Sequence, residues 1–194
     1  MRNTDGKNVI LGRIRKALAH GETSPLPMAA FPQPLPGEEA VALFTLRFIE
    51  NGGEVFRFKG SVQARAWLAA FSEEFPSAAV GVGVPIVLAP PVPAAPPEEA
   101  PLGVSLARAA AAETGSLLLD SREGRRVQLL PPCHLIWVRK ESVLGTLAEA
   151  LSRARGDLSS ALAFHSGPSR SADIGQIMVQ GVHGPGRVVV GILP

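Results

Sequence analysis

The sequence predicts an α/β protein built on a mostly parallel sheet that is covered on both faces. Three observations support this fold class. Short apolar segments alternate with amphipathic ones along residues 38–193, which is typical of βαβ units. Hydrophobic residues make up 46% of the 194-residue chain and charged residues 19%, a globular composition. The length suits one main domain.

The N-terminus is predicted to form an amphipathic helix over 8–19, with Ile10, Ile14, Ala17 and Leu18 on one stripe. A Pro-rich, extended linker follows and ends at Pro36. The expected organisation is therefore an N-terminal helix with linker over 1–36 and an α/β domain over 37–194. The helix could pack on its own domain, on a second copy in a homo-oligomer, or on another protein.

The first part of the main domain carries clear start and stop signals. Glu38 and Glu39 favour a helix start, Asn51-Gly52-Gly53 favours a stop, and Ser61 is expected to cap the next helix. The predicted elements are a helix over 38–50, a strand over 54–59, a helix over 61–75, a buried strand over 79–88 that Pro85 could break, and a Pro-rich loop over 89–101.

The second part alternates between shorter segments of both kinds. The predicted elements are strands over 102–106, 115–119, 134–138, 161–164 and 187–193, a short helical link over 108–112, a turn over 120–124, a helix over 142–153, and a helix from Ser169 or Ser171 to about Gln180.

Composition excludes several classes of protein. The net charge of +2, without a basic cluster, argues against a nucleic-acid partner. The one cysteine, Cys133, excludes an intrachain disulfide and an iron–sulfur cluster held by this chain alone. The four histidines lack the spacing of a zinc site, so no metal is expected. Seven prolines interrupt the charge-free stretch Phe75–Pro97, which argues against a membrane span. No apolar signal core occurs in 1–19, so a cytoplasmic location is expected.

Three loops are candidates for chemistry, since open α/β sheets bind ligands in loops beyond the carboxyl ends of strands. In the first, Glu113 stands beside Thr114 and Gly115. The carboxylate could act as a nucleophile or base, and the glycine would allow close approach of a substrate. Glu113 could equally cap nearby amides in a simple turn.

The second loop joins a predicted strand to a predicted helix start. It contains Ser166, Gly167, Ser169, Arg170 and Asp173. Backbone N–H groups, hydroxyls and a guanidinium at a helix start would suit a small anionic metabolite. A well-capped helix without a ligand would show the same residues.

The third loop, 181–186, places His183 among small residues including Gly184. This histidine could move protons near neutral pH, or it could lock the turn by hydrogen bonding. His134 and Cys133 are expected to be structural.

Three stretches together resemble a known family: AAETGSLLL (111–119), VQLLPPCHLIWV (127–138) and SGPSRSADIGQIMVQGVHGPGRVVVGIL (166–193). The chain is similar to the lactate-utilisation protein C family, built on the LUD domain. Ser116 and Gly175 depart from the residues common in that family, a Thr and a Glu.

The resemblance implies a three-layer α/β/α sandwich like that of sugar-phosphate isomerases and CoA transferases. It also implies a role in oxidising lactate to pyruvate beside an iron–sulfur LUD protein and a cysteine-rich subunit, with the clusters only on those partners. In that system, this chain would bind a small organic acid or dock on the iron–sulfur partners. The candidate catalytic residues are Glu113 and His183. The candidate ligand-binding residues are Thr114, Gly115, Ser166, Gly167, Ser169, Arg170, Asp173 and Gly184. The alternatives are a metabolite-binding regulatory module and a stand-alone acyl- or CoA-transferase that uses Glu113.

Overall fold

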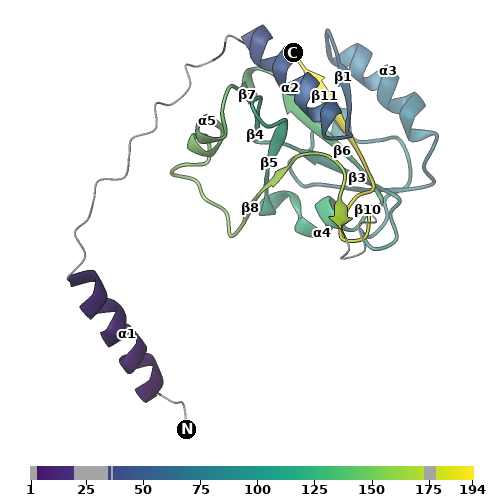
Figure 1. Cartoon of the computed structure of the whole chain (residues 1–194). Coiled ribbons are helices and arrows are strands. Elements are labelled where there is room, and N and C mark those ends of the chain that lie inside the picture. The colour runs from purple at the N-terminus through teal and green to yellow at the C-terminus, as the bar shows by residue number, and fades with distance from the viewer. Residues whose placement is uncertain (1–3, 20–34, 36, 173–177) are drawn as a thin grey trace. The chain divides into compact units, whose positions relative to one another are not determined.

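The computed structural model describes residues 4–19, 35, 37–172 and 178–194 (Figure 1). The chain divides into two units, residues 1–31 and 32–194. Helix α1 (Thr4–Ala19) lies in the first unit, and its apolar side chains Ile10, Ile14 and Leu18 are 60%, 48% and 73% exposed. None of the described helices is long and apolar enough to cross a membrane.

A five-stranded sheet forms the centre of the second unit, and every pairing in it is parallel. The strand order is β1-β11-β6-β3-β2. Its strands are β1 (Glu54–Arg57), β2 (Ala78–Val80), β3 (Leu102–Leu106), β6 (Cys133–Arg139) and β11 (Arg187–Leu193). The predicted α/β class with a mostly parallel sheet is therefore confirmed.

Successive side chains of β6 and β11 point to opposite faces of the sheet, so they pack into two separate hydrophobic cores. On one face, Trp137 and Val189 pack against helix α3 (Ser61–Ser72). The Trp137 ring lies directly over Gly191, and its indole Nε1–H donates to the Leu88 carbonyl at 3.1 Å. This face carries a cluster of aromatic rings, including Trp67 and Trp137 in an edge contact.

The other face of the central sheet packs against helix α2 (Gly37–Glu50) and a second sheet. The second sheet has the order β7-β4-β5-β8, from β4 (Ala109–Ala111), β5 (Ser116–Asp120), β7 (Val143–Leu144) and β8 (Leu162–His165). Helix α5 (Leu147–Ser152) packs on its outer side through Ala150. The remaining elements are α4 (Arg125–Leu129), the 3₁₀ turns η1 (Ile86–Leu88), η2 (Ser121–Glu123) and η3 (Lys140–Ser142), and the antiparallel pair β9 (Arg170–Ala172) and β10 (Met178–Gln180).

Helix α2 ends where the sequence predicts. The backbone N–H groups of Asn51, Gly52 and Gly53 return to carbonyls of the last helical turn. Gly52 has a φ of +91°, which favours glycine, and the Phe48 ring lies against Gly53 where a Cβ would stand. The turn therefore fixes the direction in which β1 enters the sheet.

Several predicted elements are wrong. The link over 108–112 is strand β4, because its alanines pair with β5. The strand over 79–88 stops at Val80, since Gly81 and Gly83 turn the chain into η1. Ser61 is the first helical residue, and the cap of α3 is Gly60. The helix over 142–153 starts at Leu147, because Val143 and Leu144 form β7.

The helix predicted from Ser169 or Ser171 to Gln180 is also wrong. Arg170, Ser171 and Ala172 pair antiparallel with Gln180, Val179 and Met178 as β9 and β10. The predicted helix start, and with it the anion cradle of helical N–H groups, is absent from the described residues of this segment. Asp173 lies outside the described residues.

Candidate functional site

Loops distant in the sequence meet at the turn between α2 and β1. The side-chain amide of Asn51 donates from Nδ2 to the Thr114 carbonyl at 3.0 Å. Gly167 lies against the Asn51 backbone, where an added Cβ would be 2.9 Å from the carbonyl oxygen. The Arg170 guanidinium lies against Gly52. We refer to Asn51, Thr114, Ser116, Ser166 and Arg170 as the turn site.

A chain of hydroxyl groups crosses the turn site. Thr114 Oγ1 is 2.8 Å from Ser116 Oγ, which is 2.6 Å from Ser166 Oγ. Ser116 is 3% exposed, whereas Ser166 is exposed, so the chain leads from the interior to the surface. Ser116 carries the hydroxyl that joins the other two, a role the sequence did not reveal.

Glycines let the backbones at this site approach closely. Gly115 has a φ of +59°, and an added Cβ would be 2.6 Å from the Phe48 backbone nitrogen. Gly167 has a φ of +115° beside Asn51. A side chain at either position would push α2 or its turn away. The structure therefore brings together five of the predicted residues: Thr114, Gly115, Ser166, Gly167 and Arg170.

The turn site has groups that suit a small organic acid. Arg170 is exposed and forms no ion pair with the described residues, so its planar fork can receive a carboxylate. The hydroxyls can donate or accept hydrogen bonds, as a hydroxy or oxo acid requires. The set thus combines one guanidinium with three hydroxyl groups, an arrangement that suits binding of an anion.

Glu113 is used differently. Its Oε1 accepts a hydrogen bond from the Leu147 N–H at 2.7 Å, at the start of α5, and its own N–H donates to the Gly145 carbonyl at 3.0 Å. This is the amide-capping arrangement, and it orients β4 relative to α5. A catalytic role for Glu113 stays a prediction.

The 181–186 loop braces the segment that carries Arg170. The Ser169 N–H donates to the Pro185 carbonyl and its carbonyl accepts from the Gly181 N–H, both at 2.9 Å. Gly184 packs against the Ser169 side chain, and His183 is exposed. This loop precedes β11, so it lies at the amino edge of the central sheet. The expectation that ligand loops lie at carboxyl ends is therefore wrong for this loop.

Two groups suspected of structural roles are deeply buried. Burial raises the pKa of the Cys133 thiol to about 12, which makes it a poor nucleophile. Burial, with a smaller effect of His165, lowers the pKa of His134 to about 3. His134 Nε2 lies 2.9 Å from Ser105 Oγ. Across the described ranges, no cluster of three or more His, Cys, Asp or Glu side chains could hold a metal ion.

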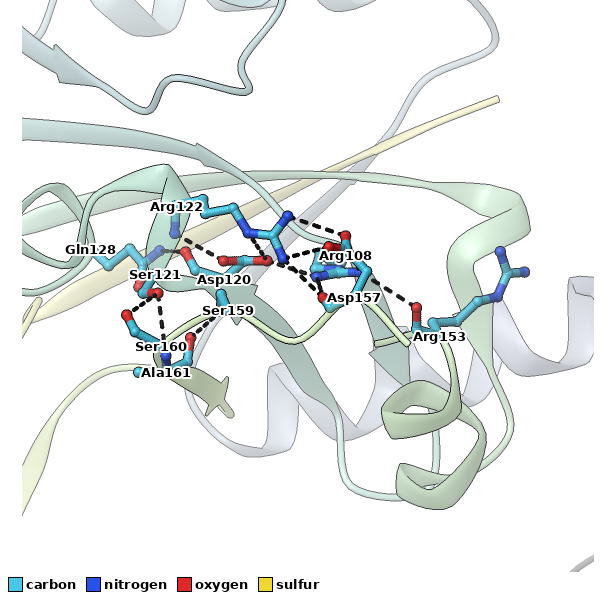
Figure 2. Close-up of polar contacts among 10 residues, drawn as sticks. All are labelled: Arg108, Asp120, Ser121, Arg122, Gln128, Arg153, Asp157, Ser159, Ser160 and Ala161. Carbon is cyan, nitrogen blue, oxygen red and sulfur yellow. Dashed lines mark hydrogen bonds and ion pairs between the residues drawn. The ribbon is translucent and has the colours of Figure 1, made fainter. Parts of the chain in front are cut away.

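A network of ion pairs lies at the end of β5 (Figure 2). Arg108 contacts Asp120 at 2.7 Å, and Arg122 contacts Asp157 at 3.0 Å. Burial alone would raise the pKa of Asp120, but the Arg122 N–H, the Ser159 hydroxyl and Arg108 outweigh it and lower the pKa. The carboxylates neutralise both guanidinium groups, so the network fastens β5 to the segment after α5.

Sequence reasoning missed Glu123, whose carboxylate lies between the ends of β2 and β3. Its Oε2 accepts from the Leu106 N–H at 3.3 Å, and Gly81 and Gly83 lie against it. Burial is the main cause that raises its pKa. The signal was the pair of glycines after Val80, which leave room for the carboxylate. The hydrogen bond from Leu106 and the close contacts with Gly81 and Gly83 hold the Glu123 carboxylate in place, so we interpret it as a structural group.

Comparison with known proteins identifies the family. Residues 98–193 match the LUD domain. The chain is 27% identical to lactate utilization protein C of Deinococcus radiodurans over 96% of this chain and 94% of that protein. It is 38% identical to lactate utilization protein C 1 of Bacillus mycoides, over 45% of this chain and 41% of that protein. With the latter, the alignment thus spans about two-fifths of the relative's length.

One solved structure has the same fold. A DUF162 family protein from Deinococcus radiodurans aligns with a TM-score of 0.65 at 20% identity, over 82% of this chain and 99% of that one. The LUD match contains β3 to β11 and therefore every residue of the turn site except Asn51. The resemblance read from the three sequence stretches is thus confirmed: residues 98–193 match the LUD domain family, and the chain is similar to lactate utilization protein C over nearly its whole length.

Proposed function

We propose that this protein is a component of a lactate utilisation system that carries no metal cluster of its own and binds a small organic acid at the turn site. The full-length similarity to lactate utilization protein C supports the metabolic role. The convergence of Arg170 with the Thr114–Ser116–Ser166 hydroxyls is the observation that supports binding of an acid.

The proposed ligand is lactate or pyruvate. Each has a carboxylate that a guanidinium can hold by two parallel hydrogen bonds, and an oxygen on the next carbon that a serine hydroxyl can meet. The exposed Ser166 would contact the ligand, while Ser116 and Thr114 would orient the Ser166 hydroxyl. Oxidation would occur on iron–sulfur partners, namely an iron–sulfur LUD protein and a cysteine-rich subunit.

Isothermal titration of the purified protein with D-lactate, L-lactate and pyruvate tests the binding proposal. We expect saturable binding of at least one acid, about tenfold weaker in Arg170→Gln because a charge-assisted pair is lost. Arg155→Gln is the matched control, since Arg155 is an exposed arginine beyond α5. No binding by any acid, or equal binding by both variants, would refute the assignment.

The metabolic role has a separate test. A source strain that lacks this chain should fail to grow on lactate, and the wild-type chain should restore growth. A tagged chain isolated from lactate-grown cells should bring down the two iron–sulfur partners. Normal growth of the deletion strain on lactate would contradict the role even if the purified protein binds an acid.

A further inference from the structure

A basic pocket lies at the edge of the central sheet opposite the 181–186 loop. It has a volume of about 500 Å³ and is lined by Arg57, Lys59, Lys140 and Glu38 together with Phe58, Ile192, Leu193 and Pro194. Arg57 ends β1, Leu193 ends β11, and Lys140 follows β6 directly. The carboxyl ends of three adjacent parallel strands, β1, β11 and β6, therefore lie at one pocket.

The connectivity of the sheet places this pocket where ligands are favoured. After β1 the chain crosses to β2 at the far edge, and then returns one strand at a time through β3, β6 and β11. The order of strands thus reverses between β1 and β11. In open α/β sheets, the crevice beyond the carboxyl ends at such a reversal is the usual ligand site.

The charges in the pocket leave an excess of positive charge. Glu38 accepts a hydrogen bond from Arg57 at 2.6 Å and pairs with Lys140. These two contacts also lower the pKa of Glu38, Lys140 being the larger cause. Lys59 is exposed and forms no ion pair with the described residues. Three side-chain cations, Arg57, Lys59 and Lys140, thus face one side-chain carboxylate, Glu38.

The excess of basic side chains suits a phosphate monoester, which carries close to two negative charges at pH 7. Lys and Arg are suited to phosphate oxygens. The apolar wall formed by Ile192 and Leu193 would accommodate an organic group, and the volume suits a small metabolite.

We infer that this pocket binds a small phosphorylated metabolite, with the phosphate held by Arg57, Lys59 and Lys140 and the organic part against Ile192 and Leu193. The pocket is distinct from the turn site. The seven-residue β11 separates the two edges of the sheet by roughly 20 Å. One protein would then respond to an organic acid at one edge and to a phosphorylated compound at the other.

Titration of the full chain with phenyl phosphate at constant ionic strength tests this inference. We expect saturable binding, with Kd raised at least tenfold in Lys59→Gln and in Lys140→Gln. Arg65→Gln, an exposed arginine on α3, removes the same charge elsewhere and should leave Kd unchanged. Glu38→Gln should tighten binding severalfold, a gain that mere damage to the fold cannot produce.

Two results would overturn the inference: no binding of phenyl phosphate at millimolar concentration, or the same Kd in all four variants. Inorganic phosphate should bind more weakly than phenyl phosphate, and equal affinity would refute the role of the apolar wall. Arg170→Gln should not change this Kd, so failure of the acid site and failure of the phosphate pocket give different results.

Discussion

The close approach at Gly115 gives a stability prediction with a defined magnitude. In Gly115→Ala, the new Cβ would lie 2.6 Å from the Phe48 nitrogen and 2.7 Å from the Arg47 carbonyl carbon, both in the backbone of α2. The φ of +59° costs an L-residue about 1–2 kcal/mol. Displacement of a packed helix adds about 1–3 kcal/mol. We therefore expect Gly115→Ala to lower the free energy of unfolding by about 2–5 kcal/mol.

Gly156→Ala separates the two contributions. Gly156 also has a positive φ, +90°, but an added Cβ there meets nothing within 4 Å. Gly156→Ala should therefore lower the free energy of unfolding only by the cost of the positive φ, about 1–2 kcal/mol. Urea denaturation of both variants measures the difference, since the midpoint shifts by the lost free energy divided by m. If Gly115→Ala costs no more than Gly156→Ala, the argument that α2 closes on this turn is refuted.

Three further predictions concern buried polar groups. Asp120→Asn should destabilise the protein by about 1–3 kcal/mol at pH 7, measured by urea denaturation. Because the fold lowers the pKa of Asp120 below 3.8, that contribution begins to fall once the pH drops below 3.8 and is gone below the folded value, so a destabilisation at pH 3 as large as that at pH 7 would contradict the assignment. The pKa of His134, about 3, means that only the unfolded state gains its proton between pH 6.5 and 3. Stability should then fall with acid by at most about 1.4 kcal/mol per pH unit from this group, and His134→Gln should flatten that slope. Cys133, with a pKa of about 12, should react with a thiol reagent at pH 8 only after unfolding, and rapid reaction of the native protein would show that it is accessible.

The main elements of the fold could be predicted because their signals are local. The apolar runs at 134–138 and 187–193 are buried strands, and the acidic start and glycine stop of α2 lie at its ends. The wrong predictions concern segments whose secondary structure depends on pairing with residues distant in the sequence. Ala109–Ala111 has high helix propensity, yet it becomes a strand because β5 and β7 pair with it. Local propensity cannot reveal such pairing.

The candidate site could be predicted in part. The sequence indicates Thr114 and Ser166 as loop residues, but their link through Ser116 spans 50 residues from 116 to 166. The sequence indicates Asn51 only as part of a helix stop, whereas in the structure its side chain also donates a hydrogen bond to the Thr114 loop. The prediction of an anion-binding helix start at Ser169 is wrong because Gln180 pairs with Arg170 in a two-stranded sheet instead of ending a helix. Contacts of this kind depend on tertiary arrangement, which a single sequence does not display.

The position of β11 has a consequence for how the chain folds. The last strand in sequence lies between β1 and β6, so Val190 pairs with Val55, a residue from the first third of the chain. Until β11 has been synthesised, β1 has no neighbour in the sheet and β6 has an unpaired edge. Such long-range parallel pairing slows folding and leaves apolar strand edges exposed meanwhile. A chain that loses its last eight residues would therefore lack the strand that joins β1 to the rest of the sheet, and we expect it to aggregate or be degraded.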